Sequence, residues 1–556
     1  MATIPVASSS ESQPAAKAKD ATTPRSLDGI LQYISAGWDT LTRSMNKCES
    51  LEDTKTGGEA FLYLPSGMEI PSAVAELQNH CRVRVEHLPT AITRLGEIDL
   101  SKIPTEGLLY LENPYVVPGG QFNEMYGWDS YFIIRGLLRD HRGDLAKGMV
   151  ENFFFEIEHY GGVLNANRTY YLTRSQPPFL SSMILAVYED ETAEGKADLP
   201  WLAKAYGFAL RDYEQWTAQP HLAGKTGLSR YFDHGKGPVP EILGDPGQYY
   251  SSAAYFFLAH GPSFKSYLFH EKESGSASST IPGMSFPVFE CTPETADIGA
   301  SECAVGSRIG LTEDYYKGDR SMRESGFDVT FRFGPFGAAT HHFAPVCLNS
   351  LLYKTEKDLE RMSELLGRPE DAMKWEVRAA ERRKRMIQYL WNGRSGLFFD
   401  YNFVARRQSR YAFATTFYPL WAGLASKEEA GEVAQNSNQF EQAGGLATSR
   451  TQTEAQWDYP YGWAPLQLLA VEGLRRYGYE READRISENF LSMVLENFRR
   501  DHTIREKYNV VTRSSETSVV EGYAQNVTGF GWTNAVFLEL LHGSPEVKAA
   551  LDKDTE

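Results

Sequence analysis

The chain has 556 residues, and its 56 Lys and Arg stand against 73 Asp and Glu, which gives a net charge of −17. This length excludes a small disulfide-stabilised module and allows one large domain or roughly two to four ordinary ones. The negative charge argues against nucleic acid or an anionic membrane as a partner, because both require a basic surface. No stretch reaches about 18 consecutive apolar residues, so none is expected to span a bilayer.

The first 25 residues are rich in Ala, Ser, Pro and Lys. They lack the apolar core of a secretory signal and cannot bury enough apolar surface to fold. We therefore expect a disordered tail over residues 1–25 and a cytoplasmic location, with a cleaved targeting peptide as the alternative. The five cysteines have no metal-binding spacing. They are expected to be thiols of a reducing compartment, and a disulfide such as Cys291–Cys303 is the alternative.

Most segments after the tail have the spacing of amphipathic helices. Between Pro345 and Leu366, apolar residues recur every three or four positions and place one stripe on a helix face. Further helices are predicted at Trp128–Arg139, Gly148–His159, Ser181–Tyr188, Pro200–Trp216, Glu370–Trp391, Ala464–Tyr477, Glu480–Phe498 and Trp532–Leu541. Short strands are predicted at Leu108–Leu111 and Leu397–Tyr401. Because β-branched runs between the helices are missing, a parallel α/β fold is not expected.

Loops dense in aromatic and polar residues connect these helices along the whole chain. Many amphipathic helices joined by such loops favour an all-α fold, a toroid of paired helices whose loops line a central pocket. Residues 257–317 are rich in Ser, Gly, Pro and Thr and show little periodicity, which predicts a long insertion over that pocket. No linker separates parts of different composition. We therefore expect one domain over residues 26–545 and a C-terminal tail over 546–556.

The loops contain the residue types that bind a saccharide. Aromatic faces cover the C–H surfaces of a sugar, and planar polar side chains bind its hydroxyls. Trp128-Asp129, Arg174-Ser175-Gln176, Trp457-Asp458 and Trp463 supply both kinds of group. A single loop of this kind is more often part of a helical core. Several of them along one chain favour a small-molecule saccharide as the partner.

Several of these loops carry a family resemblance. PGGQFNEMYGWDSYF and QWDYPYGWAP resemble the two signatures of the trehalases, glycoside hydrolase family 37. NANRTYYLTRSQPP, ESGFD, LNSLLYKTEKDL, FYPLWAG, EKYN and GFGWTN are similar to further blocks of that family, in the same order. The resemblance runs from about Leu111 to Leu541. It implies the (α/α)6 toroid of the six-hairpin glycosidases and hydrolysis of a glycoside, with α,α-trehalose as the leading substrate.

The resemblance also implies the catalytic pair. Inverting glycosidases use two carboxyl groups on opposite faces of the sugar, roughly 6.5–9.5 Å apart, with a water between one of them and the sugar. By motif, Asp328 matches the general acid and Glu506 the general base. An apolar wall at Phe327 would keep the acid protonated, and the cations Arg505 and Lys507 would favour an ionised base if they point inward.

The remaining expected site residues bind the substrate. Phe122, Trp128, Asp129, Asn165, Arg174, Ser175 and Gln176 match residues that hold the glucose at the cleavage subsite, and Glu241 and Glu521 match residues that bind the leaving sugar. Gln121, Gly326 and Trp457 belong to the same motifs and are expected to line the pocket, and Phe122, Trp128, Phe327 and Trp457 are expected to lie on the sugar. No cofactor is implied, because acid, base and water complete the reaction. The residues predict no oligomeric state.

The chain departs from the family at the leaving-group side. Gln121 stands where trehalases carry the Arg of PGGRF, and Val239 stands where they carry the Arg of RPES. Neither replaces the charged fork of donors that Arg provides. Arg308, Lys317 or Arg320 could compensate. The departures leave two alternatives open: hydrolysis of another α-linked glucoside or glycosylglycerate-type solute, and an inactive sugar-binding or sensing protein.

No metal site is predicted. His341 and His342 are adjacent, and two neighbouring histidines on a helix do not point to one site. A third ligand at a suitable spacing is also missing from the sequence around them.

Overall fold

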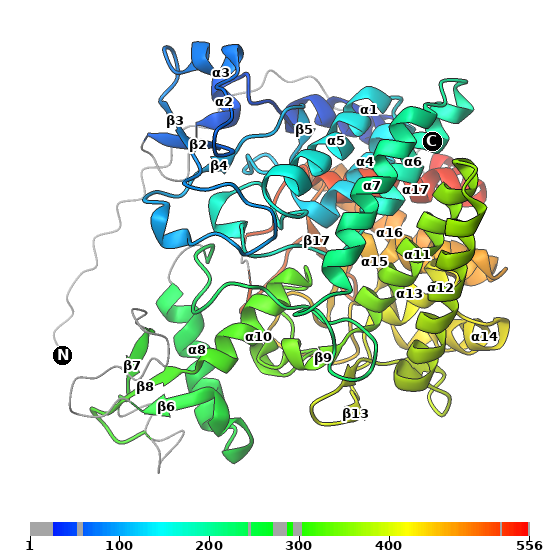
Figure 1. The fold of residues 1–556 in the computed structure, drawn as a ribbon. Coiled ribbons are helices and arrows are strands. Elements are labelled where there is room, and N and C mark those ends of the chain that lie inside the picture. The colour runs from blue at the N-terminus through cyan, green and yellow to red at the C-terminus, as the bar shows by residue number, and fades with distance from the viewer. Residues whose placement is uncertain are drawn as a thin grey trace.

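The computed structural model describes residues 26–52, 59–242, 246–270, 286–292, 303–522 and 525–553. The predicted N-terminal tail, residues 1–25, lies outside the described residues. Figure 1 shows helices as the dominant element, with a small sheet near the N-terminal part and another near the insertion. Among the described residues, no helix has the length and apolar character needed to cross a bilayer.

An inner ring of helices forms the centre of the described structure. Each helix packs against the next one in the chain order, and the last packs against the first, so the ring closes. Its members are α4 (Gly127–Arg139), α6 (Leu180–Ala193), α11 (Val346–Leu365), α13 (Tyr418–Trp421), α15 (Ala464–Arg476) and α17 (Gly531–Gly543).

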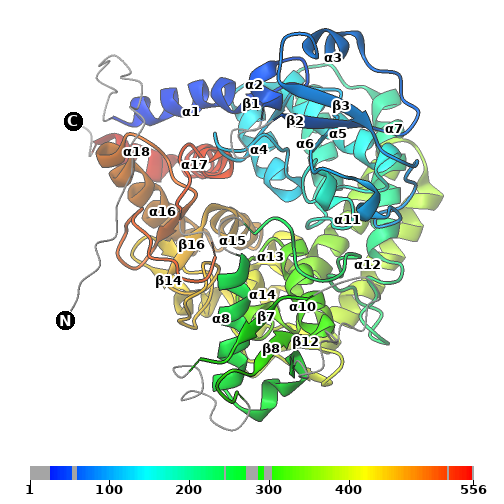
Figure 2. The same ribbon diagram turned by 90° about the vertical axis from the view of Figure 1, so that its left-hand side faces the viewer.

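An outer helix precedes each inner helix in the chain. The outer set consists of α1 (Leu27–Leu41), α5 (Gly143–His159), α7 (Leu199–Trp216), α12 (Pro369–Leu390), α14 (Lys427–Gln435) and α16 (Glu480–Asp501). α5 and α7 lie over α6, α12 lies over α11, and α16 lies over α15 and α17. Outer and inner helices therefore alternate around a ring, as Figure 2 shows, and the predicted (α/α)6 toroid is confirmed.

The apolar stripes in the sequence predict which helices form and which face of each is buried. In α11, Leu348, Leu351, Leu352, Leu359 and Met362 are all buried, as their spacing predicts. All nine helices predicted from spacing are present, with ends that differ from the prediction by a few residues. α10 (Glu313–Glu324) has no apolar stripe in the sequence, because its buried face consists largely of tyrosines and charged residues: Tyr315, Tyr316, Asp319, Arg320 and Arg323.

A small parallel sheet lies beside the ring on the N-terminal side. It contains β2 (Ala60–Leu64) between β3 (Val83–His87) and β4 (Leu108–Leu109), and α3 (Ser72–Leu77) connects β2 to β3. Only β4 coincides with a predicted strand. The expectation of no parallel α/β fold holds for the ring, but this unit is a local exception to it. The Cys48–Cys81 disulfide joins α2 (Cys48–Leu51) to the residues before β3.

The predicted insertion contains regular structure. α8 (Pro246–Ala259) and η3 (Pro262–Tyr267) lead to an antiparallel sheet of β6 (Leu268–His270), β8 (Arg308–Leu311) and β7 (Val288–Glu290), in that order. In Figure 1 this unit lies apart from the ring, at the lower left. It has a hydrophobic core of its own, which includes Phe257, Ile309, Tyr315 and Tyr316. The parts of the insertion at 271–285 and 293–302 lie outside the described residues.

Short strands join the remaining loops. The pairs are β1 (Thr42–Arg43) with β5 (Tyr115–Val116), β10 (Trp391–Asn392) with β11 (Leu397–Phe398), β12 (Tyr401–Asn402) with both β9 (Phe343–Ala344) and β13 (Arg407–Gln408), β14 (Glu441–Gln442) with β15 (Gly445–Leu446), and β16 (Tyr461–Trp463) with β17 (Lys507–Asn509). The last pair matters for the site, because it places Trp463 opposite Lys507.

The C-terminal residues differ from the prediction. The expected tail over 546–556 is instead helical as far as Lys553, where α18 (Pro545–Lys553) ends. α18 packs on α16 and α17 and buries Val547 and Leu551. The spacing of these two residues is one helical turn, but a single short stripe was too weak a signal to predict the helix.

Four of the five cysteines form two disulfides. Cys48 pairs with Cys81, and Cys291 pairs with Cys303. Cys347 is the unpaired one and is buried. The expectation of thiols is therefore wrong for four of the five, because residues 33 and 12 positions apart in sequence meet in the fold.

The disulfides give the first testable prediction. Thiol titration of the purified protein, unfolded without reductant, should detect one thiol per chain, that of Cys347. Reductant should expose four more. Five thiols before reduction would show that neither disulfide forms in the protein.

Candidate active site

The candidate site residues lie on the loops that lead into the inner helices. Each inner helix follows an outer helix that runs the other way, so these loops share one end of the ring. Trp128 and Asp129 begin α4, Gln176 precedes α6, Trp457 precedes α15, and Glu506 lies between α16 and α17. The toroid thus brings together residues that are hundreds of positions apart in sequence.

Asp328 lies on the loop that follows α10. Its side chain is 21% exposed, and Oδ2 is 3.7 Å from Nη1 of Arg323. Its backbone oxygen accepts a hydrogen bond from Nε2 of Gln456. The apolar wall expected from Phe327 is therefore only part of the surroundings of this carboxyl group, because a guanidinium group also faces it.

Glu506 is held by its backbone on both sides. Its N–H donates to the carbonyl oxygen of Val527 at 3.0 Å, and its carbonyl oxygen accepts from Trp532 Nε1 and Thr533 Oγ1, both at 3.4 Å. Its side chain is 11% exposed. The carboxylate is thus nearly buried, and the backbone that carries it is fixed by contacts with residues 527–533.

Lys507 is the cation that meets Glu506. Its ammonium group is fully buried, lies 3.2 Å from Glu506 Oε2, and donates to Gln456 Oε1 at 3.0 Å. It also lies over the ring of Trp463, 5.3 Å from the centroid. The expected inward cation is present at Lys507, whereas Arg505 donates to the backbone oxygen of Asn526 instead.

Asp129 is a third carboxyl group of the candidate site. It is buried, and its pKa is raised well above the ordinary value by burial first, and then by the negative charges of Glu506 and Asp328. Asp328 and Glu506 are 178 positions apart in sequence, and Gln456 links them: it donates to the backbone oxygen of Asp328 and accepts from the ammonium group of Lys507, which lies beside Glu506.

A cluster of buried aromatic rings lies behind these carboxylates. Trp457 stacks on Trp463 with the ring centroids 3.8 Å apart, and Trp128 packs against Phe327, Trp457 and Trp532. Phe327 has no exposed surface, and Trp128 and Trp457 are each 2% exposed. All three rings are thus buried within the cluster, and their expected contact with a sugar stays a prediction. Phe122 is only half-buried and faces Tyr126 and Phe530.

Gly326 fits directly against this cluster. Its φ is +76°, and a Cβ atom there would lie 2.9 Å from the ring of Trp128. Both the backbone conformation and the space therefore require glycine at the turn that leads to Asp328.

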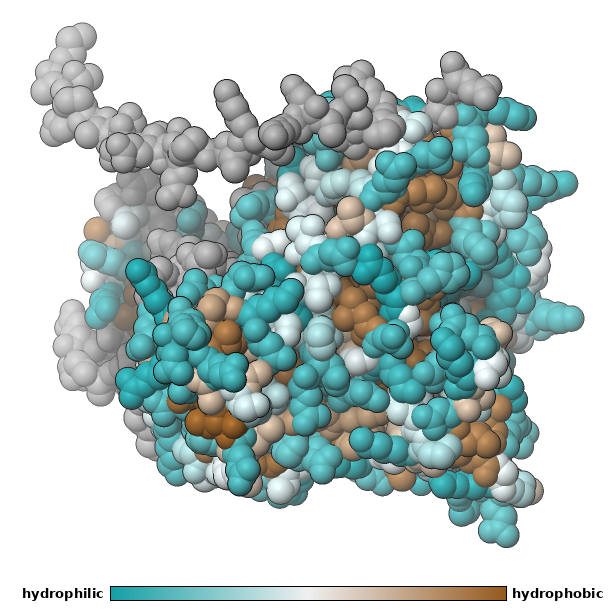
Figure 3. Space-filling model, turned by 90° about the horizontal axis from the view of Figure 1, so that it is seen from above, coloured by the Kyte–Doolittle hydropathy of each residue, from teal (hydrophilic) through white to brown (hydrophobic). Residues whose placement is uncertain are grey.

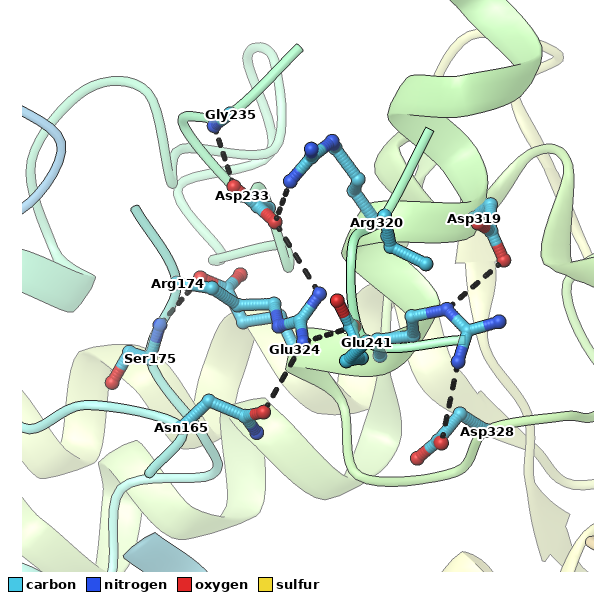
Figure 4. A network of polar contacts seen from close by, with 12 residues as sticks. Asn165, Arg174, Ser175, Asp233, Gly235, Glu241, Asp319, Arg320, Glu324 and Asp328 are labelled. Atoms are coloured by element: carbon cyan, nitrogen blue, oxygen red, sulfur yellow. Dashed lines mark hydrogen bonds and ion pairs between the residues drawn. The ribbon is translucent and has the colours of Figure 1, made fainter. Parts of the chain in front are cut away.

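A second charge network surrounds Arg174, as Figure 4 shows. Arg174 forms an ion pair with Glu241, lies 3.6 Å from Asp233 Oδ2, and donates to Asn165 Oδ1 at 3.2 Å. Its guanidinium also lies over the ring of Tyr171. Asp233 was not predicted, because it belongs to no motif recognised in the sequence. Glu241, expected to bind the leaving sugar, has Arg174 as its partner.

Ser175 and Gln176 bind protein groups. Ser175 Oγ donates to the carbonyl oxygen of Val163 at 2.6 Å, and Gln176 Oε1 accepts from the backbone N–H of Trp128 at 2.9 Å. The second bond satisfies an N–H in the first turn of α4 that has no partner within the helix. The two residues therefore fix the 165–176 loop against the start of α4.

The cations expected to compensate for the missing arginines have other partners. Arg320 donates to the backbone oxygens of Gly237 and Pro238, and Lys317 donates to those of Asp233 and Gly235. Both therefore hold the 233–238 loop. Arg323, which stands in the RESGFD block but was not singled out, is the arginine that contacts Asp328. Its position, five residues before Asp328 in the same block, is the sequence feature that could identify Arg323 as a site residue.

The two departures from the family lie in different surroundings. Gln121 is exposed, on a turn whose Gly120 oxygen accepts from Arg43. Val239 is buried, and its N–H donates to the hydroxyl of Tyr250. Glu521 is 9% exposed, and burial and the charge of Glu454 raise its pKa to about 7.

His341 and His342 do meet a common third residue. They lie on η5 (Thr340–His342), and their Nε2 atoms are 2.9 and 3.7 Å from Asp314 Oδ1. The three groups could hold a metal ion by distance alone. The argument that adjacent histidines cannot share one site is therefore wrong here, because the tighter 3-10 turn brings their rings within 4.0 Å.

One face of the molecule is largely polar. Figure 3 shows hydrophilic side chains surrounding small hydrophobic patches on the face seen from above.

Comparisons with known proteins agree with the geometry. A family model described as Trehalase matches residues 9–254 and 308–544. The cytosolic neutral trehalase of Saccharomyces cerevisiae is 35% identical over 560 residues, which cover 90% of this chain and 69% of the relative. That of Kluyveromyces lactis is 37% identical over 557 residues, with the same coverage. The solved structure of neutral trehalase Nth1 from Saccharomyces cerevisiae superposes with a TM-score of 0.75 at 33% identity, over 95% of this chain and 96% of that chain.

Gly326 gives a stability prediction with a matched control. Gly326→Ala should lower the free energy of unfolding by about 1–2 kcal/mol for the positive φ and by a further 1–3 kcal/mol or so for the contact with Trp128. Gly195→Ala has the same φ, +75°, but open space around it, and should show only the first loss. Urea unfolding measures both. Equal losses would contradict the packing described for Gly326.

Glu521 gives a pH prediction. Its pKa is about 7 in the fold and ordinarily 4.5, so its contribution to stability is present at low pH and is lost as pH rises through 7. The free energy of unfolding of the wild type, minus that of Glu521→Gln, should therefore fall between pH 5 and pH 8. Urea unfolding at several pH values measures this difference. A constant difference would contradict the assignment.

Proposed function

The chain belongs to the trehalase family, and we propose that it hydrolyses α,α-trehalose to two glucose molecules with inversion at the carbon attacked. The family match and the relatives named above support a glycoside hydrolase with this substrate. The observation that carries the mechanism is the hydrogen-bonded link from the backbone of Asp328 through Gln456 to Lys507 and the carboxylate of Glu506.

Asp328 and Glu506 have complementary roles in this mechanism. Asp328, as general acid, gives its proton to the glycosidic oxygen, and the bond from that oxygen to the anomeric carbon breaks. Glu506, as general base, takes a proton from a water whose oxygen bonds to the anomeric carbon from the opposite face. The products are one glucose with inverted configuration and one leaving glucose. Before the next turnover, Asp328 must regain a proton from solvent and Glu506 must release one to it.

The surroundings of Glu506 suit the role of base, and the carboxyl group of Asp328 is accessible to a substrate. Lys507 lies 3.2 Å from Glu506 and favours the ionised form that a base needs. Asp328 is the more exposed of the two, at 21% against 11%, which leaves its carboxyl group accessible to a glycosidic oxygen. The buried indole cluster behind them excludes water from one side of the site.

The substrate-binding roles follow from the same loops. Asn165, Arg174 and Gln176 are proposed to hold the glucose at the cleavage subsite, and Glu241 and Glu521 to accept hydroxyls of the leaving glucose. Arg174 already contacts Asn165 and Glu241. It therefore joins the two proposed subsites.

The location of the protein stays a prediction. The relatives are named as cytosolic. Two disulfides, by contrast, are typical of chains that fold in an oxidising compartment. Thiol titration on protein purified from its native cells under alkylating conditions distinguishes the two, since a cytosolic protein should yield five modified thiols.

Proton NMR of the reaction tests the proposed function. Hydrolysis of trehalose by inversion should release β-glucose and α-glucose in equal amounts before mutarotation. Asp328→Asn and Glu506→Gln should each lower kcat by about 10²–10⁴-fold, the range typical of acid–base groups. Release of α-glucose alone would exclude inversion, and a near-normal rate in either variant would exclude that residue. Faster turnover of another α-glucoside in a substrate panel would replace trehalose as the substrate.

Lys507 gives a second catalytic prediction. Lys507→Met keeps most of the side-chain volume but removes the ammonium group that contacts Glu506 and Gln456, so kcat should fall by about tenfold or more. Arg505→Met is the matched control, because it removes the cation on the other side of Glu506 in sequence, which binds Asn526. Steady-state kinetics, with melting temperatures to check folding, separate the two. Equal losses of kcat would contradict a specific role for Lys507.

A further inference from the structure

The start of α10 and the 3-10 turn η5 bring three metal-binding side chains together. Asp314 lies in the first turn of α10, and His341 and His342 lie on η5, which packs against this helix. In Figure 1 the strand that follows η5, β9, lies beside α10. The ligand atoms of the three residues all lie within 4.8 Å of one another. These residues are separate from the expected catalytic and substrate-binding residues.

The three side chains converge on one point. Nε2 of His341 and Nε2 of His342 lie 2.9 and 3.7 Å from the same oxygen, Oδ1 of Asp314. Two atoms bound to one Zn²⁺ at about 2.0–2.1 Å in tetrahedral geometry are about 3.4 Å apart, and the two measured distances lie on either side of this value. A hydrogen bond accounts only for the approach of His341, because 3.7 Å is too long for one. A shared metal ion accounts for both approaches.

The backbone that carries the two histidines is fixed by hydrogen bonds. The carbonyl oxygen of His341 accepts from Nη1 of Arg230 at 2.9 Å, and that of His342 accepts from the backbone N–H of Phe403 at 3.1 Å. The turn is therefore anchored on both sides without the use of either imidazole ring. A metal ion would find its ligands already in place, which lowers the entropy lost on binding.

The exposure and the chemistry of the three groups indicate which ion fits. The side chain of Asp314 is 47% exposed and that of His342 is 25% exposed, so an ion can enter from solvent. Two imidazoles and one carboxylate suit Zn²⁺ and the neighbouring first-row metals, whereas Ca²⁺ and Mg²⁺ bind oxygen ligands. Zn²⁺ with three protein ligands takes a water as the fourth, and the exposed side of the cluster leaves room for that water.

We propose that Asp314, His341 and His342 form a binding site for one divalent transition-metal ion such as Zn²⁺. The ion replaces the hydrogen bond between His341 and Asp314, because a ring nitrogen that binds a metal carries no hydrogen. These two residues are 27 positions apart, and the segment between them contains Asp328. A bound ion therefore joins the two ends of the segment that holds the expected acid. The site does not depend on the proposed function, which assigns no role to its three residues.

Metal titration of the purified, chelator-treated protein tests the site in solution. The wild type should bind one Co²⁺ per chain with the visible absorption of imidazole-bound cobalt, and Zn²⁺ should displace it. In calorimetry, His342→Gln should weaken Zn²⁺ binding by at least the roughly 10–100-fold lost when a residue that only supports a ligand is changed. His80→Gln, the same change at an exposed histidine, should bind like the wild type. Equal affinities of the two variants, or no binding to the wild type, would overturn the proposal.

Crystals of the wild-type protein grown with zinc chloride test the location. The expected result is an anomalous peak at the zinc edge between α10 and η5, about 2.0–2.2 Å from Nε2 of both histidines and Oδ1 of Asp314. Zinc bound only elsewhere, for example at the candidate catalytic carboxylates, would overturn the proposal. Should His342→Gln fail to fold, as judged by its melting temperature, Asp314→Asn at an exposed position and the wild-type crystal decide.

Discussion

The buried ammonium group of Lys507 is the interaction on which the candidate site depends. A cation removed from water is costly unless it is paired and hydrogen-bonded. Lys507 meets this requirement with Glu506 and Gln456, and the amide of Gln456 reaches the backbone oxygen of Asp328. One buried charge thus ties together the loop after α10, the loop before α15 and strand β17. The positions of the two carboxylates relative to each other follow from the requirement to keep this charge paired.

Helix α10 links this arrangement to the second charge network. Arg320 points to the 233–238 loop, and Arg323, which also pairs with Asp319 at 3.3 Å, points to Asp328. The same helix therefore sets both the loop that holds Asp233, next to Arg174, and the turn that holds the expected acid. α10 lies outside the ring of inner helices and positions two of the loops at the site: the 233–238 loop and the turn that carries Asp328.

The sequence predicts those parts of the structure whose signals are local. The apolar stripe of α11 fixes that helix, and the QWDYPYGWAP and REKYN blocks identify Trp457 and Glu506 by residue type and order. Other features depend on contacts between distant segments and have no local signal. α10 buries tyrosines and arginines instead of leucines, and Asp233 meets Arg174 across 59 positions. The disulfide partners are 33 and 12 positions apart. The motif around Phe327 likewise predicts that this residue lies near the site, but it does not predict that the ring is fully buried among other aromatic rings.

The hydrophobic core of the insertion includes residues of α10, so a change in the insertion also affects this helix. The family model passes over residues 255–307. Tyr315 and Tyr316 nevertheless project from α10 into the core of that segment, and Arg320 and Arg323 follow within two turns of the same helix. Removal of the segment would expose two tyrosines on the helix that aligns the acid, so a lineage could gain or lose it only together with compensating changes in α10. The insertion and helix α10 therefore depend on each other for packing, although the insertion lies outside the ring.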